Sequence, residues 1–129
     1  MNKLIIAILF FSFSAFGSTA ENLEKLKVPA EWNQVKIAYS QIDEAITELE
    51  KTNDEKLTVA ILKAYAKVGK KEKSLGGLET FAPYYKKHSK KVSELAKKHL
   101  SKEEAEAVLF GLNAMSENVG KGNDPSVKN

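Results

Sequence analysis

Residues 32–49 read Trp-Asn-Gln-Val-Lys-Ile-Ala-Tyr-Ser-Gln-Ile-Asp-Glu-Ala-Ile-Thr-Glu-Leu. Apolar side chains recur there every three or four residues, at Trp32, Val35, Tyr39, Ile42, Ile46 and Leu49. Because an α-helix has 3.6 residues per turn, this spacing forms one apolar stripe, typical of a helix packed at a shallow angle. No stretch of the chain after residue 20 alternates apolar and polar residues as a half-buried strand would. The stretch therefore predicts an all-α fold.

The same periodicity predicts further helices after this one. Together the four predicted helices cover about residues 29–51, 54–68, 83–100 and 102–119. Thr52-Asn53-Asp54-Glu55 and Ser101-Lys102-Glu103-Glu104 have the capping-box pattern that begins a helix, and Gly69 suits a helix end. Short loops favour antiparallel neighbours, so we expect a small up-down antiparallel helical bundle. The alternative fold is a helical hairpin pair that dimerises into a bundle. Separately, the stripe of the first helix allows a structural or assembly protein that dimerises through this helix.

The first twenty residues have the pattern of a secretory signal peptide. The start is positively charged, residues 4–16 are apolar apart from two serines, and Ser18 and Ala20 are the small residues that a signal peptidase recognises. At ~1.5 Å per residue the apolar run reaches only about 20 Å, which is too short for a hydrocarbon core of ~30 Å. We therefore expect residues 1–20 to be cleaved off after Ala20 and the protein to be periplasmic or secreted.

The remaining chain has the composition of one small globular domain. Of all 129 residues, 43% are hydrophobic and 29% are charged, and cysteine is absent. The absence of cysteine excludes disulfides and thiolate metal sites, so core packing alone must hold the fold together. Residues 120–129 are rich in Gly, Asn, Asp and Ser and predict a flexible C-terminal tail. The helical bundle domain is therefore expected over residues 21–119.

The charge is distributed very unevenly along the chain. The formal net charge is only +3, yet residues 63–102 contain twelve Lys and three Glu, while residues 21–62 and 103–129 are net acidic. On one continuous helix over residues 83–100, lysines would form an almost purely cationic outer face. This face would consist of Lys86, Lys87, Lys90, Lys91, Lys97 and Lys98.

We interpret this cationic face as a binding surface, to which Tyr84 and Tyr85 would add aromatic contact. The expected partner is an anionic component of the cell envelope or an acidic protein. Intramolecular neutralisation by the acidic first and fourth helices is the alternative. Every basic residue is Lys, and the lack of Arg argues against nucleic acid because bidentate phosphate and base contacts use Arg.

The sequence lacks the motifs of catalysis and of most metal sites. There is no G-x-S-x-G, no H-E-x-x-H and no Glu-x-x-His before His88 or His99. We therefore expect a binding protein rather than an enzyme, with no cofactor. The alternative is a haem- or copper-carrying bundle that uses His88 and Met115, which a turn near Leu100 would bring to one level. We favour the interpretation in which both histidines lie on the buried stripe and Met115 fills core space.

Overall fold

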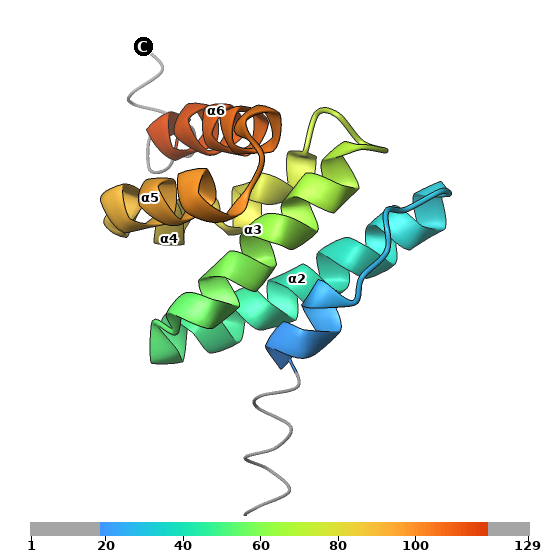
Figure 1. The fold of residues 1–129 in the computed structure, drawn as a ribbon, viewed down its shortest axis with the longest axis horizontal. Helices are drawn as coiled ribbons and strands as arrows, with labels where there is room; N and C mark the ends of the chain where they lie inside the picture. The colour runs from blue at the N-terminus through green and yellow to red at the C-terminus, as the bar shows by residue number, and fades with distance from the viewer. Residues whose placement is uncertain (1–18, 119–129) are drawn as a thin grey trace, which may run out of the picture.

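The computed structural model describes residues 19–118, so most of the predicted signal peptide and the predicted tail lie outside the described residues. The elements are α2 (Trp32–Thr52), α3 (Glu55–Gly69), the 3₁₀ helix η1 (Gly76–Thr80), α4 (Ala82–Lys87), α5 (Ser89–His99) and α6 (Lys102–Asn118). Residues 19–24 are also helical, and no strand occurs within residues 19–118 (Figure 1). The prediction of an all-α helical bundle is confirmed. None of the helices within this range has the length and apolarity that crossing a bilayer requires.

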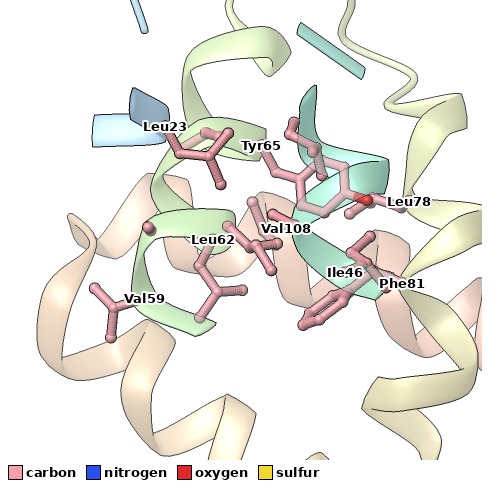
Figure 2. Packing of buried hydrophobic residues seen from close by; sticks show 14 of the residues in the cluster. Leu23, Ile46, Val59, Leu62, Tyr65, Leu78, Phe81 and Val108 are labelled. Carbon is pink, nitrogen blue, oxygen red and sulfur yellow. The ribbon is translucent and has the colours of Figure 1, made fainter. Parts of the chain in front are cut away.

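Helix α3 lies at the centre of the structure, between α2 on one side and the α5–α6 pair on the other (Figure 1). Most of its residues are buried, because neighbours cover it on several sides. Figure 2 shows Leu62 and Tyr65 of α3 packed among Ile46, Phe81 and Val108, which come from other elements. Burial of such side chains contributes about 1.5–3 kcal/mol each, so α3 is the main organiser of the core.

The segment before α2 is fastened to α3. Leu23 is buried in the core, on the helical residues 19–24. The Lys67 ammonium donates hydrogen bonds to the backbone carbonyls of Glu24 at 2.8 Å and Leu26 at 2.7 Å. One lysine of α3 therefore satisfies carbonyls at the end of the N-terminal helical segment, where no helical partner is available.

The helix predicted over residues 83–100 is not continuous, which is a correction to the sequence prediction. His88, at φ −128° and ψ 34°, ends α4 and precedes α5. Its backbone N–H donates to the carbonyls of Tyr84 and Tyr85, each at 3.1 Å. Because the dihedrals leave the helical range here, residues on the two sides of His88 no longer share one helical face. The expected count of four helices is therefore wrong for the described part of the chain.

The helix ends show which capping patterns form. The Ser101 N–H donates to Glu104 Oε1 and the Glu104 N–H donates to Ser101 Oγ, both at 3.1 Å, so the predicted capping box before α6 is confirmed. The pattern at Thr52 does not form one, because Thr52 Oγ1 accepts from the Asp54 N–H instead. Glu31 and Gln34 form a capping box that the sequence analysis did not predict. As a result, α2 begins at Trp32, three residues later than predicted.

The loop between α3 and η1 packs closely against α2. Glu72 accepts a hydrogen bond from the Tyr39 hydroxyl and another from the Gly76 N–H. Gly77 lies so close to α2 that an added Cβ would overlap the Tyr39 ring. At the outer edge of the loop, the Lys71 ammonium lies 5.0 Å from the centre of the Trp32 ring, within the range of a cation–π contact.

Candidate functional site: a lysine-lined hollow

The junction of α4 and α5 carries a surface hollow, here called the lysine hollow. It is lined by Lys87, His88, Ser89, Lys90, Lys91 and Glu94. Residues 89–91 form the first turn of α5, where backbone N–H groups have no helical acceptor and the helix dipole is positive. The lysine side chains therefore give this surface a positive potential that attracts anions.

The lysines of the hollow are not neutralised one for one by carboxylates. Lys91 pairs with Glu55 at the start of α3, at 3.7 Å between Nζ and Oε2. An exposed pair of this kind contributes about 0–1 kcal/mol, so it opens readily. Lys87 and Lys90 have no ion-pair partner among residues 19–118. Within the described residues, one of the three lysines of this hollow is therefore in direct contact with a carboxylate.

The other lysines of the predicted cationic face lie outside the hollow. Lys86 belongs to α4, before the break, whereas Lys97 and Lys98 lie in the last turn of α5. Lys97 lines a different hollow, which also contains Lys102 and Leu109 of α6. The predicted single cationic face is therefore divided: one part surrounds the start of α5 and another lies near its end.

Tyr84 and Tyr85 do not lie on the surface, which corrects the expectation that their rings add contact there. Their exposed fractions are 5% and 3%. The Tyr84 hydroxyl donates to Asn53 Oδ1 at 3.1 Å, and the Tyr85 hydroxyl donates to Asn113 Oδ1 at 2.7 Å. Both rings point inward because partners far away in the sequence satisfy their hydroxyls and let them be buried.

An aromatic series runs through the core to the lysine hollow. Successive ring centres lie 6.3, 6.0, 5.6 and 4.4 Å apart along Tyr39, Tyr65, Phe81, Tyr84 and His88. Pairs at such distances stabilise one another beyond simple burial. The half-buried His88, which lines the hollow, is thus held against Tyr84 of the core.

The histidines and Met115 occupy different settings. His99 is exposed at the end of α5, so its predicted place on the buried stripe is wrong. Met115 packs half-buried against the core from α6, as expected of a space-filling residue. Haem or copper binding by His88 and Met115 stays a prediction. Residues 19–118 contain no group of three or more His, Cys, Asp or Glu that could hold a metal ion.

Comparison of the chain with protein-family models, with curated proteins and with solved structures gave no match.

Proposed function

We propose that the protein is an exported binding protein whose lysine hollow holds an anionic component of the cell envelope. The observation that carries the proposal is the convergence of Lys87, Lys90 and Lys91 at the positive end of α5. The only acid lining the hollow is Glu94. Export is supported by the signal-peptide pattern of residues 1–20, with cleavage proposed after Ala20.

The chemistry of the hollow favours charge over shape in the choice of ligand. Each Lys ammonium is a compact point charge that cannot make the bidentate contacts of an Arg guanidinium. Phosphate groups exposed at the surface of a lipid bilayer suit such a site, since each nearby Lys contributes about 1 kcal/mol of attraction to an anionic membrane. We expect binding that weakens steeply with salt, because the lysines lie in solvent. The proposed activity is retention at the membrane surface without a chemical step.

The proposal is tested with vesicles of phosphatidylcholine, with and without phosphatidylglycerol, in a sedimentation assay at low salt. The mature protein is expected to bind only the anionic vesicles. Lys87→Gln/Lys91→Gln should weaken this binding roughly tenfold or more, by the loss of two charges. Lys36→Gln/Lys51→Gln is the matched control, since it removes the same charge from exposed positions on α2. Equal weakening by both variants would show that net charge alone is responsible and would contradict the proposal.

An acidic protein is the other partner that the sequence predicts, and the same variants distinguish it. In that case the parent protein binds neither kind of vesicle. Affinity capture from envelope extract then retrieves an acidic protein, and the Lys87→Gln/Lys91→Gln variant loses it. That result would replace the membrane by a protein as the partner of the hollow.

A further inference from the structure

The outward side of α6 carries an exposed phenylalanine among acids. The helix buries Ala105, Val108 and Leu112. At about 100° per residue, the side opposite these three carries Glu103, Glu106, Phe110 and Glu117. Phe110 is 78% exposed, the largest fraction among the exposed large hydrophobic residues of the described chain. We call these four residues the α6 stripe.

The neighbouring helix α5 has the opposite charge on its outward side. It buries Val92, Leu95 and Ala96, so Lys90 and Lys97 lie on the far side, two turns apart, and Glu94 lies between them. We call Lys90 and Lys97 the α5 pair. Because α5 and α6 lie side by side over α3 (Figure 1), the α5 pair and the α6 stripe face outward from one surface.

An apolar hollow separates the two charged rows. Its walls are Lys97 of α5 and Lys102, Ala105, Glu106 and Leu109 of α6. The half-buried Leu109 precedes the exposed Phe110 in sequence, so apolar surface continues from the hollow to the α6 stripe. A basic row, an apolar centre and an acidic row thus follow one another across a single face.

We propose that this face binds a second copy of the same chain. In a two-fold dimer, each contact between one residue and another occurs twice with the copies exchanged. A two-fold axis through the hollow places the α5 pair of each copy on the α6 stripe of the other. Basic residues then meet acidic residues on both sides, and each Phe110 ring, as part of its α6 stripe, is withdrawn from water against α5 of the other copy. Lys90 belongs both to the lysine hollow and to the α5 pair, but the test of the proposed function changes only Lys87 and Lys91 and therefore leaves both rows of the dimer intact.

The first test is the molar mass in solution, measured by sedimentation across a range of protein concentrations. The parent protein is expected to form a dimer whose dissociation constant rises with salt. Phe110→Ser should shift this equilibrium to the monomer by at least tenfold, while Ile37→Ser, at a residue 55% exposed on α2, should leave it unchanged. A parent protein that is monomeric at all concentrations, or a dimer that survives Phe110→Ser, overturns the proposal.

A charge exchange tests the pairing of the two rows. Lys90→Glu/Lys97→Glu and Glu106→Lys/Glu117→Lys should each be monomeric, because like charges then meet twice. An equimolar mixture of the two variants should restore a dimer that contains one copy of each, since every contact again joins opposite charges. Circular dichroism of each variant establishes that it is folded. A mixture of folded variants that remains monomeric contradicts the proposed arrangement.

Discussion

The Tyr39 hydroxyl in α2 donates a hydrogen bond to the carboxylate of Glu72, a residue of the loop between α3 and η1. The same carboxylate oxygen accepts the Gly76 N–H at 3.2 Å. One side chain therefore joins α2 to the start of η1 and fixes the course of the loop between them. Burial, followed by the hydrogen bond to Glu72, raises the pKa of Tyr39 far above its ordinary value, so the hydroxyl remains a donor in alkaline solution.

Replacement of Tyr39 by Phe removes this donor and keeps the ring. We expect the free energy of unfolding to fall by about 1–2 kcal/mol, because the bond goes to a charged group. Urea unfolding measures the loss, and amide exchange at Gly76 should accelerate as the Glu72 carboxylate gains freedom. Ser40→Ala, at an exposed neighbour on the same helix, is the control. If the two variants were equally stable, the Tyr39–Glu72 contact would have no part in holding the loop.

The two adjacent glycines of η1 should respond very differently to alanine. A Cβ on Gly77 would overlap the Tyr39 ring, whereas a Cβ on Gly76 meets nothing within 4 Å. Gly77→Ala is therefore expected to lose about 1–3 kcal/mol through overpacking, and Gly76→Ala to stay within about 0.5 kcal/mol of the parent. Thermal or urea unfolding of the pair decides the point. A similar loss in both would mean that backbone freedom, and not contact with Tyr39, requires glycine here.

Asp43 makes the stability depend on pH in an unusual direction. Its Oδ1 atom is buried without a hydrogen-bond partner, and burial raises its pKa, with partial relief from the Thr80 side chain. A carboxyl group whose pKa is higher in the folded state binds its proton more tightly there. Its contribution is therefore most favourable below its ordinary pKa and is lost as the pH rises through the folded-state value.

Asp43→Asn is expected to remove this dependence and to stabilise the protein at pH 7 by about 1 kcal/mol, because no charge is then buried. Urea unfolding between pH 3 and pH 7 compares the two proteins, and their difference in stability should grow with pH. Glu44→Gln, at the exposed neighbouring position, should leave the pH profile of the parent unchanged. A constant difference between Asp43→Asn and the parent across this range would exclude the raised pKa as the cause.

Lys67 is expected to govern how firmly residues 21–26 stay docked. Lys67→Met keeps an apolar stem of similar length but removes both hydrogen bonds to the Glu24 and Leu26 carbonyls. We expect a loss of about 1–2 kcal/mol and faster amide exchange confined to the first helical segment. Lys63→Met, at a half-buried position one turn earlier on α3, is the matched control. Unchanged exchange in the N-terminal segment would contradict this function of Lys67.

Local patterns in the sequence predicted much of the fold. The spacing from Val35 to Leu49 predicted α2, and Gly69 and the Ser101 capping box marked helix ends that the structure has. Such features depend on neighbours three or four residues away, which the sequence displays directly. The break at His88 was not predictable in this way, because the apolar spacing continues through it from Tyr85 to Val92.

In the candidate site too, features set by sequence neighbours were predictable, and features set by distant residues were not. Lys90 and Lys91 lie on the outside of a helix, as their spacing predicted. The inward positions of Tyr84 and Tyr85 depend on Asn53 and Asn113, which no local pattern connects to them. In the sequence alone, two consecutive tyrosines beside a basic run resemble a binding surface. In the structure they are core residues whose hydroxyls donate hydrogen bonds to asparagine side chains.

The contact between Trp32 and Lys71 gives the protein an intrinsic optical reporter. Trp32 is the single tryptophan of the chain and is 57% exposed, and the ammonium over its ring belongs to the loop that Glu72 fixes. Any displacement of that loop changes the electrostatic surroundings of the indole and hence the wavelength and yield of its fluorescence. Loop opening can therefore be followed in real time, in the unlabelled protein, from the emission of one native residue.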